Sequence, residues 1–586
     1  MTSRARVTRQ QTQSRSRRLP STPARSDPAP LLLASGLKAA QVAGLLTPYG
    51  IRDIAQADAN IQAMAGEPHT RHQLADILRT LLESVARTAD PDQALNHWER
   101  LLSGGVTRST FLEYVRSSPR MLDLLCAIFG NSDSLAFTLI RDPTLIYWLA
   151  EQDVLSKPPS RQEMAEALHR NLANLITTEL KLEALRRFRR REMLRIGVRD
   201  LLRLATVPQT TAALSDLASV LIHAAYEIVD ADLRAQHGGP MYKDRHGRWV
   251  ETGFAVIGMG KLGGHELNYS SDVDLIYVYE SDAGETRSPG NGPSKARGRA
   301  GESISNEEYF ELLARGLTQA LANQTQEGYV FRVDLRLRAE GSVGRLARSL
   351  DEYARYYRTR GQVWERLALL KAWPVAGSAD VGQTFVRLVE PFVFDAAGKR
   401  MDPASARSVV QEVRAVKDMI DEKIAGRGHE RRNVKLGVGG IREIEFLVQT
   451  IQVIAGRVLP ALLDRSTLGS LVRFERCGLL SARQRASLKE AYLFLRDIEH
   501  KLQMVHDLQT HALPETEEEL QRCAVRMGYG SEDREATLRR FRADYARHTR
   551  VVHDAFRNLF HTSTRSTLLK AAMRAMQSSR TRGTAR

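Results

Sequence analysis

Residues 253–279 constrain the fold more than any other part of the chain. Residues 254–257 form a short apolar run that ends in glycines, and residues 273–279 form a second run rich in β-branched and aromatic side chains. Runs of this kind are typical of central strands that are covered on both faces. Most of the remaining chain spaces its apolar residues three and four apart, which predicts helices. We therefore expect an α+β protein that is predominantly helical and contains a small mixed sheet.

The helical pattern divides the chain on either side of this sheet. A length of 586 residues allows about three to four domains. We expect a disordered basic tail at 1–30, a helical domain at 31–235, a domain that holds the sheet at 236–400, a helical bundle at 401–563 and a second basic tail at 564–586. The pattern also predicts a loop at 281–303, an alternating strand at 329–338 and helices at 305–322, 350–371, 405–424, 441–456, 465–478, 481–510 and 533–562.

The net charge of +16 suggests nucleic-acid binding, but the charge is concentrated at the two ends. Residues 1–26 hold seven arginines, and residues 555–586 hold six arginines and one lysine, with no acid in either segment. The ends therefore carry +14, which leaves only +2 for residues 27–554. Basic ends can touch nucleic acid or a membrane surface, although solvated tails are more common. We expect no specific nucleic-acid partner.

The cysteines and the apolar runs bear on the location of the protein. Cys126, Cys477 and Cys523 are far apart in the sequence, and no Cys/His spacing suggests zinc. Buried reduced thiols in a cytoplasmic protein are the simplest interpretation. No apolar run reaches the roughly 18 residues needed to span a bilayer, and the N-terminus lacks the apolar core of a secretory signal. We expect a cytoplasmic protein with no membrane partner.

The glycine-rich segment after the first apolar run is suited to a phosphorylated ligand. Gly258, Gly260 and Gly263 follow the predicted strand, where glycines let the backbone approach a ligand closely. Backbone N–H groups exposed there can bind phosphate oxygens. The spacing is not that of a Walker loop, and the next strand follows too soon for a dinucleotide-binding crossover.

Asp272 and Asp274 stand at the start of the second predicted strand. Residues two apart on a strand share a face, so the two carboxylates point the same way about 7 Å apart at the backbone. Carboxylates this close repel each other unless a cation lies between them, and Mg²⁺ favours oxygen ligands and substrate phosphates. A solvent-exposed pair at a strand start is the alternative.

The alternating strand supplies a third acid. Asp334 shares a face with Arg332, Arg336 and Arg338. One carboxylate among arginines resembles a metal ligand beside phosphate-binding cations, although a solvated ladder of ion pairs fits the same pattern. Three acids behind a glycine loop suit metal-dependent phosphoryl or nucleotidyl transfer, in which metal ions clamp the reacting oxygens.

Residues 258–275 and 332–338 together resemble the glutamine synthetase adenylyltransferase family, which belongs to the polymerase-β-like nucleotidyltransferases. In this fold a glycine pair is followed after roughly ten residues by Asp-x-Asp, and here residues 261–271 separate Gly260 from Asp272. Residues 363–366, the region of Lys371 and residues 435–446 extend the resemblance to most of 31–560. Ala339 stands where the family tends to have proline, which affects a turn and none of the acids.

The resemblance implies an enzyme that acts on glutamine synthetase in the control of nitrogen assimilation. Family members usually carry two catalytic halves, one that attaches AMP to a tyrosine and one that removes it by phosphorolysis to ADP. This chain has one set of motifs, and it is most similar to the removing, N-terminal half. The implied small molecules are Mg²⁺, ATP or ADP, and inorganic phosphate. Glutamine synthetase is the implied protein partner, and a PII-type signal protein is a further candidate.

The resemblance also gives expectations for individual residues. Asp272, Asp274 and Asp334 would be catalytic metal ligands, and the nucleotide would contact Gly258, Gly260, Lys261, Gly263, Ser270, Ser271, Arg336 and Arg338. A solvated lysine or a serine that caps a turn is an equally simple interpretation of Lys261, Ser270 and Ser271. The resemblance places Arg442, Glu443 and Glu445 at the cleft, whereas acids in a first helical turn are common in any helix.

Two other functions remain open at this point. A nucleotidyltransferase that acts on RNA or on a small molecule would keep the fold, but the nearly neutral body of the chain argues against RNA. A protein that only binds glutamine synthetase or a PII protein would have no need of three converging carboxylates.

Overall fold

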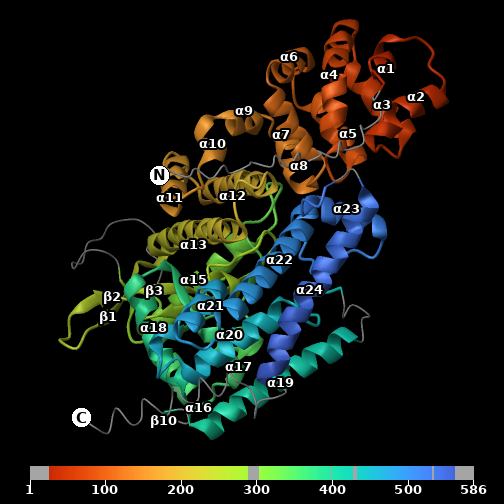
Figure 1. The fold of residues 1–586 in the computed structure, drawn as a ribbon. Coiled ribbons are helices and arrows are strands. Elements are labelled where there is room, and N and C mark those ends of the chain that lie inside the picture. The colour runs from red at the N-terminus through yellow and green to blue at the C-terminus, as the bar shows by residue number, and fades with distance from the viewer. Residues whose placement is uncertain are drawn as a thin grey trace, which may run out of the picture.

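The computed structural model describes residues 26–287, 303–396, 399–400, 402–425, 432–530 and 533–560. The two predicted basic tails lie almost entirely outside these residues, and so does most of the predicted loop at 281–303. The described chain consists mainly of helices around a small mixed sheet (Figure 1). The predicted α+β class with mostly helical content is therefore confirmed.

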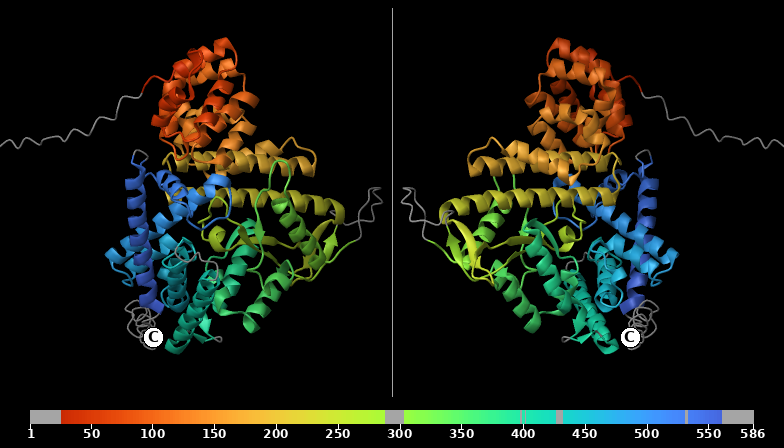
Figure 2. Two further views of the ribbon diagram at one scale, coloured as in Figure 1. Left: turned by 90° about the vertical axis from the view of Figure 1, so that its right-hand side faces the viewer. Right: turned by 90° about the vertical axis from the view of Figure 1, so that its left-hand side faces the viewer.

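The chain before the sheet is helical, as its apolar spacing predicts. Asp53, Asp90 and Ser132 each accept a backbone hydrogen bond in the first turn of the helix that follows, which marks where that helix begins. The shorter helices gather at one end of the molecule, and α12 and α13 lie side by side next to them (Figures 1 and 2). The helices are α1 (Pro30–Leu33), α2 (Ala39–Leu46), η1 (Thr47–Tyr49), α3 (Ile54–Ala65), α4 (Pro68–Ala86), α5 (Pro91–Gly104), α6 (Arg108–Ser117), α7 (Pro119–Phe129), α8 (Asp133–Arg141), α9 (Thr144–Ala150), α10 (Gln152–Ser156), α11 (Arg161–Leu172), α12 (Thr178–Leu201) and α13 (Val207–His237).

The central sheet has the strand order β6-β4-β3-β8, and β7 also pairs with β4. β3 runs antiparallel to β4 and β8, whereas β6 and β7 run parallel to β4, so the sheet is mixed. Its strands are β3 (Phe254–Gly258), β4 (Val273–Tyr279), β6 (Val333–Asp334), β7 (Ala347–Ser349) and β8 (Trp373–Gly377). Two minor sheets consist of β1 (Gly239–Lys243), β2 (Trp249–Glu251) and β5 (Glu285–Arg287), and of β9 (Asp395–Ala396) and β10 (Lys399–Arg400).

The predicted strand at 329–338 is wrong for most of its length, because only Val333–Asp334 is a strand. β7 pairs with residues 277–279 of β4, which leaves at most residues 273–276 of that edge, and β6 pairs with the first two of these. The backbone N–H groups of Val330 and Phe331 bond to the carbonyl of Leu321 instead. Polar and apolar residues therefore alternate over 329–338 as in a strand, but only residues 333 and 334 pair with a neighbouring strand.

The helices around the sheet also differ from the prediction in one place. The helix expected at 350–371 is two helices, since Gln362 and Glu365 form a capping box that starts a new helix after a break. The helix expected at 305–322 begins after Ser305, whose side chain accepts a hydrogen bond from the N–H of Glu308. These elements are α14 (Gly260–Gly263), α15 (Asn306–Ala322), η2 (Gly341–Val343), α16 (Leu350–Thr359), α17 (Val363–Leu369) and α18 (Ala379–Phe394).

The C-terminal part is a helical bundle beside the sheet (Figure 1). Five of its helices match the predicted ranges within a few residues, and α23, a short helix that begins with three glutamates, was not predicted. The C-terminal end of α22 reaches the N-terminal helices, where the Ser132 hydroxyl donates to the carbonyl of Met504. The helices are α19 (Pro403–Ala425), α20 (Ile441–Ala455), η3 (Pro460–Leu462), α21 (Thr467–Arg476), α22 (Ala482–His506), α23 (Glu517–Arg526) and α24 (Arg534–Phe560).

β4 separates two hydrophobic cores, which explains its apolar sequence. Leu275 and Tyr277 belong to the core shared with the N-terminal helices and α15. Ile276 and Val278 belong to the core on the opposite face, shared with α18 and α20. Because alternate strand residues share a face, Asp274 lies on the same side as Ile276 and faces the C-terminal helices.

α13 is long and apolar enough to cross a membrane by length and composition, contrary to the expectation that no segment would be. In this structure 67% of its most apolar window is buried inside the protein, against α12, α15 and β8. Cys126 and Cys523 are buried as expected, and burial raises the pKa of each thiol to about 12. Cys477 is half-buried.

Candidate active site

The register of β4 and β6 brings the three predicted aspartates together. Asp274 and Asp334 are directly paired residues on these neighbouring parallel strands. Paired residues on parallel strands point to the same face, and Asp272, two positions before Asp274, shares that face. We call Asp272, Asp274 and Asp334 the aspartate cluster. The expectation that the first two share a face, and that the third lies beside them, agrees with this register.

Two members of the aspartate cluster already have arginine partners. Nε of Arg332 donates to Oδ1 of Asp272 at 2.7 Å, and the amide of Gln509 lies 3.3 Å from its other oxygen. Nε of Arg336 donates to Asp334 at 3.0 Å. Partial burial would raise the pKa of Asp334, but these hydrogen bonds outweigh it and hold the pKa below its usual range. Both carboxylates therefore accept hydrogen bonds from an arginine.

Asp274 is different, because its carboxylate has no hydrogen-bond or ion-pair partner among the residues that the structure describes. Burial and the neighbouring Asp334 raise its pKa to about 6. Gly260, with φ of +52°, packs directly against it, since a Cβ at that position would lie 2.3 Å from Oδ2 of Asp274. A carboxylate that is largely shielded from solvent and has no counter-charge is unfavourable, so the site has the electrostatic character of an incomplete cation site.

The carboxylates of the aspartate cluster limit the kind of divalent-cation site that can form here. Within the described ranges, no three His, Cys, Asp or Glu side chains stand close enough together to form a complete metal cage. Mg²⁺ does not need one, because it is usually held by one or two carboxylates together with water and substrate phosphates. Asp274, with Asp334 beside it and Asp272 on the same face, fits that kind of site.

The two arginines predicted to bind phosphate, Arg336 and Arg338, lie in different environments. The side chain of Arg336 is 79% exposed at the mouth of the site. Arg338 is buried, and its guanidinium donates to the carbonyls of Leu335, Ser342 and Gly344. The strand face that was expected to present both side chains ends at Asp334, so the chain turns and carries Arg338 into the fold. Arg338 stabilises this turn, and its role as a phosphate ligand is not supported by its contacts.

The glycines predicted to contact the nucleotide are positioned by packing. A Cβ on Gly263 would lie 1.9 Å from the carbonyl oxygen of Lys371, and one on Gly258 would lie 2.8 Å from a methyl of Val375. Only Gly260 of the three lies against the aspartate cluster. Two of these glycines are needed for close contact within the protein, and contact of Gly258, Gly260 and Gly263 with a nucleotide stays a prediction.

Lys261 does not reach toward the cavity over the aspartate cluster. Its ammonium donates to Oε1 of Glu499 at 2.9 Å, and burial lowers the pKa of Lys261 to about 7 even with this partner. Glu499 also accepts from His511 at 3.0 Å and is fully buried. The expected phosphate contact of Lys261 is thus replaced by an ion pair with a residue 238 positions away.

Ser270 and Ser271 act in the turn before β4. The hydroxyl of Ser270, a buried residue, donates to the carbonyl of Asp507, and its own carbonyl accepts from Arg332 at 2.6 Å. The hydroxyl of Ser271 accepts from the backbone N–H of Asn268 at 3.4 Å. The turn-capping alternative therefore describes Ser271, whereas the hydroxyl of Ser270 connects this turn to the segment after α22.

The three residues expected at the cleft from α20 divide into two groups. Arg442 pairs with Glu445 at 3.1 Å, and the charge of Arg442 acts on Asp274, so this pair lies on the side of the aspartate cluster. Glu443 is turned away, because the next residue on a helix is rotated by about 100°. It pairs with Lys417 at 3.3 Å and with His553 at 3.4 Å inside the bundle.

Sequence reasoning missed two residues at the site. Gln509, which follows α22, reaches Asp272, and no local pattern could have linked positions 237 apart. Lys435 stands before the glycine-rich turn at 437–440 and acts electrostatically on Asp274 and Glu445. Its signal was a lysine at the start of a glycine turn within a segment that already resembled the family.

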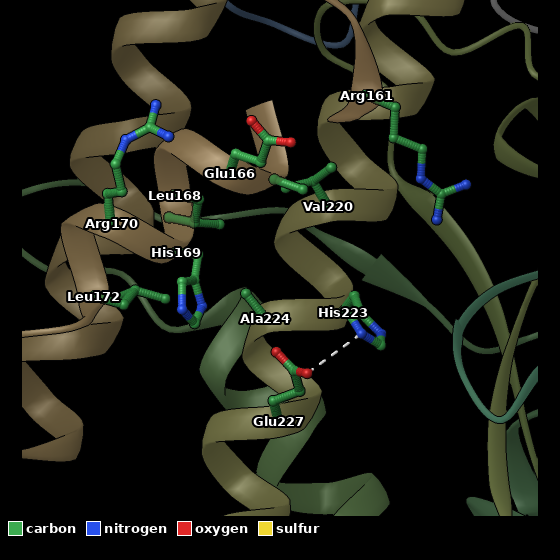
Figure 3. Close-up of a pocket in the computed structure, with 11 residues that line it drawn as sticks. Arg161, Glu166, Leu168, His169, Arg170, Leu172, Val220, His223, Ala224 and Glu227 are labelled. Carbon is green, nitrogen blue, oxygen red and sulfur yellow. Dashed lines mark ion pairs between the residues drawn. The ribbon is translucent and has the colours of Figure 1, made fainter. Parts of the chain in front are cut away.

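An open cavity of about 400 Å³ lies over the aspartate cluster, and it is lined by Asp272, Arg332, Val333, Asp334, Leu335, Arg336, Arg338 and Gln509. A larger cavity of about 610 Å³ lies elsewhere, between α11 and α13. Figure 3 shows that its carboxylates come from these helices and that Glu227 is paired with His223. No glycine turn or acid pair converges there, so the smaller cavity is the candidate active site.

Two family models match parts of this chain. Residues 122–388 match the family model described as glutamate-ammonia ligase adenylyltransferase, and residues 414–560 match the one described as GlnD PII-uridylyltransferase. The first region contains the whole aspartate cluster, and the second contains Lys435 and α20.

Several curated relatives are named bifunctional glutamine synthetase adenylyltransferase/adenylyl-removing enzyme. The one from Hahella chejuensis is 38% identical over 407 residues, which is 70% of this chain and 40% of that protein. The one from Nitrosococcus oceani is 36% identical over 441 residues, which is 75% of this chain and 42% of that protein. The one from Thioalkalivibrio sulfidiphilus is 35% identical over 485 residues, which is 83% of this chain and 44% of that protein. The chain thus spans less than half the length of these relatives.

Proposed function

The chain belongs, over residues 122–388, to the glutamate-ammonia ligase adenylyltransferase family, and on this basis we propose that it is a nucleotidyltransferase that controls glutamine synthetase. It would remove AMP from a tyrosine of that enzyme, attach AMP to it, or do both. The observation that carries the proposal is Asp274, a half-buried carboxylate without a partner among the described residues, paired in register with Asp334 inside the matched region. The catalytic domain would have a polymerase-β-like fold, with boundaries at about 236–400.

The aspartate cluster would hold Mg²⁺ when the substrates bind. The ion would polarise the phosphoryl oxygens and neutralise the charge that develops on them. Asp274 would be the main ligand, and Asp272 would join it on the same face. Asp334 would position the attacking oxygen. Arg336, which is exposed and bound only to Asp334, is free to rotate toward a phosphate, as a bidentate donor suited to that group.

The favoured direction is removal of AMP, on the resemblance of residues 266–272 and 439–446 to the removing half. In that reaction an oxygen of inorganic phosphate attacks the phosphorus of the tyrosine-linked AMP. The bond from phosphorus to the tyrosine oxygen breaks, ADP is released, and the phenol oxygen takes up a proton. Attachment would use the tyrosine oxygen as the nucleophile on ATP and would release diphosphate.

The regions outside the aspartate cluster suggest how partners reach it. We propose that the helical bundle at 401–563 presents the protein substrate, because α20 borders the site through Arg442 and Glu445. The match of residues 414–560 to a PII-uridylyltransferase model supports a PII-type signal protein as a second partner. A cytoplasmic location goes with both partners.

A direct assay of the full chain tests the proposal. The protein is first incubated with AMP-modified glutamine synthetase, Mg²⁺ and phosphate, and then separately with unmodified glutamine synthetase and ATP. Loss of AMP with release of ADP supports removal, and labelling of the tyrosine supports attachment. If neither reaction occurs while glutamine synthetase still binds, the chain is a binding module and the proposed activity is wrong.

A further inference from the structure

Arg332 lines the cavity beside the aspartate cluster, but its guanidinium is already committed to contacts inside the protein. Nε donates to Oδ1 of Asp272 at 2.7 Å, and Nη1 donates to the hydroxyl of Tyr329 at 2.9 Å. Nη2 donates to the carbonyl of Ser270 at 2.6 Å and to its hydroxyl oxygen at 3.1 Å. All three nitrogens of this side chain therefore have an acceptor.

Ser270 connects Arg332 to the end of α22. The N–H of Ser270 donates to the side-chain carbonyl of Gln503 at 3.2 Å, and its hydroxyl donates to the backbone carbonyl of Asp507 at 2.9 Å. Ser270 and Gln503 are both buried. Asp507 ends α22 in a left-handed conformation with φ of +51°, which aspartate tolerates better than most residues. Hydrogen bonds thus run without a break from α22 through Ser270 and Arg332 to Asp272.

The second oxygen of Asp272 is contacted from the same region. Gln509, two residues after Asp507, donates its amide to Oδ2 of Asp272 at 3.3 Å. Asp272 is therefore held on both oxygens, whereas Asp274 has no hydrogen-bond or ion-pair partner in the described ranges. Each oxygen of a carboxylate has two acceptor positions, so these contacts orient Asp272 and still leave it able to bind a cation.

The alternative role for Arg332 is that of a phosphate ligand, as proposed for Arg336. The two side chains differ in their freedom to move. Arg336 is 79% exposed and contacts only Asp334 among the described residues, so it can turn toward a ligand. Arg332 is 37% exposed and would have to leave acceptors on three other residues to do the same. Its contacts therefore favour a role within the protein.

We propose that Arg332 is a positioning residue, which ties Asp272 to the end of α22 and so sets the orientation of this carboxylate toward a divalent cation. The inference rests on the proposed function, in which Asp272 is a metal ligand. Loss of a partner that orients a metal ligand commonly lowers metal affinity by about 10- to 100-fold. A guanidinium suits this task because its donors point in fixed directions, whereas a lysine ammonium is a point charge on a flexible stem.

The test measures metal binding to the full chain without a turnover step. Mn²⁺ is the probe, and its binding is followed by electron paramagnetic resonance with and without ADP. Arg332→Lys keeps the positive charge but loses the fixed directions of the donors, so its affinity for Mn²⁺ should fall by about tenfold in both conditions. Arg358→Lys, the same exchange at an exposed arginine of α16, is the matched control and should bind Mn²⁺ as wild type does.

A second variant weakens the connection and keeps the arginine. Ser270→Ala loses the hydroxyl that contacts Asp507 and Arg332, while the backbone carbonyl of residue 270 remains. Loss of a neutral hydrogen bond should lower the affinity for Mn²⁺ by about two- to fivefold, which is less than in Arg332→Lys. Ser103→Ala, at an exposed serine of α5, is its control and should have no effect.

Two further measurements separate positioning from a loss of folding. The far-UV circular dichroism spectra of Arg332→Lys and Ser270→Ala should match that of wild type. With AMP-modified glutamine synthetase, kcat of Arg332→Lys should fall while KM for the protein substrate stays the same, and a higher Mg²⁺ concentration should restore part of kcat.

The inference would be overturned if folded Arg332→Lys bound Mn²⁺ within twofold of wild type, or if wild type bound Mn²⁺ neither with nor without ADP. Should Arg332→Lys fail to fold, unchanged Mn²⁺ binding in Ser270→Ala would overturn it. The failure of the proposed function looks different. If both variants weaken Mn²⁺ binding but wild type does not act on glutamine synthetase, the positioning role stands and the proposed substrate is wrong.

Discussion

Two groups of charges lie within a few residues of each other, and they are built in opposite ways. Two members of the aspartate cluster, Asp272 and Asp334, line an open cavity, and the third, Asp274, has no partner among the described residues. The other group, which we call the buried ion network, consists of Lys261, Glu266, Lys371, Arg496 and Glu499. It is closed, with Arg496 1% and Glu499 0% exposed.

The buried ion network connects the glycine turn before β4 to α21 and α22. Glu266 accepts from Lys371 at 2.9 Å and from the hydroxyl of Thr467 at 3.1 Å, and Arg496 donates to the carbonyl of Glu266. Every charge in it has a protein partner, so the network orients the two regions relative to each other. Complete matching of charges thus distinguishes a structural group from one that awaits its substrate.

The largest effect is expected from breaking the buried ion network. Glu499→Gln removes the negative charge that pairs with Lys261 and His511, and it leaves these two largely buried groups without an ion-pair partner among the described residues. Loss of one partner from a buried ion pair usually destabilises a protein by about 3–5 kcal/mol. The midpoint of urea unfolding should fall accordingly.

The control for this change is on the same helix. Glu490→Gln replaces an exposed glutamate of α22 and should leave the midpoint nearly unchanged. Equal midpoints for Glu499→Gln and Glu490→Gln would show that the buried ion network does not hold the two regions together.

Asp274→Asn should have the opposite effect on stability. Burial and the neighbouring Asp334 raise the pKa of Asp274, so the charged carboxylate is unfavourable in the folded state. The neutral amide of asparagine should therefore stabilise the fold at neutral pH. Tm should stay constant or rise. Turnover should fall by more than about 100-fold, since loss of even an outer-shell partner of a metal ligand costs about 10- to 100-fold. An active or strongly destabilised Asp274→Asn variant would mean that the carboxylate has a structural role.

The same residue predicts a pH dependence. The pKa of Asp274 is about 6 in the folded chain, above the usual 3.8, so the folded state takes up this proton first as pH falls. The contribution of Asp274 to stability should therefore increase as pH falls from about 6 toward 4. The difference in Tm between wild type and Asp274→Asn should shrink over this range. Binding of Mg²⁺ should weaken below pH 6, because the proton competes for the carboxylate. A constant difference in Tm would contradict the raised pKa.

The parts that the sequence predicted correctly depend on local geometry. The alternation of side chains along a strand placed Asp272 and Asp274 on one face. The apolar run at 273–279 gave the bounds of β4. The spacing of apolar residues three and four positions apart predicted most of the helices for the same reason. In each case the residues involved are close in the chain, so a repeat in the sequence is a repeat in space.

The parts that could not be predicted depend on distant partners. Lys261 follows the expected glycine turn, but whether it meets a phosphate or a carboxylate is decided by Glu499 on α22. The alternation at 329–338 was real, yet β7 occupied the edge of β4 on which a longer strand would have paired. Arg338 turned inward because the strand ended. The partners of Lys261, the length of β6 and the position of Arg338 are decided only when the sheet and the helical bundle come together.

The smallest effect on the fold is expected at Arg336, which lies on the rim of the aspartate cluster. Its side chain is 79% exposed, so its pair with Asp334 is screened by solvent and Arg336→Gln should change stability by less than about 1 kcal/mol. If Arg336 turns to a phosphate during the reaction, kcat/KM should fall by about tenfold at low salt and by less at high salt, because ions screen an exposed charge. Arg358→Gln, an exposed arginine on α16, is the control and should not respond to salt in this way. A loss that is the same at both salt concentrations would mean that Arg336 acts by holding Asp334 in place. Arg336 would then be a structural part of the aspartate cluster and not a phosphate ligand.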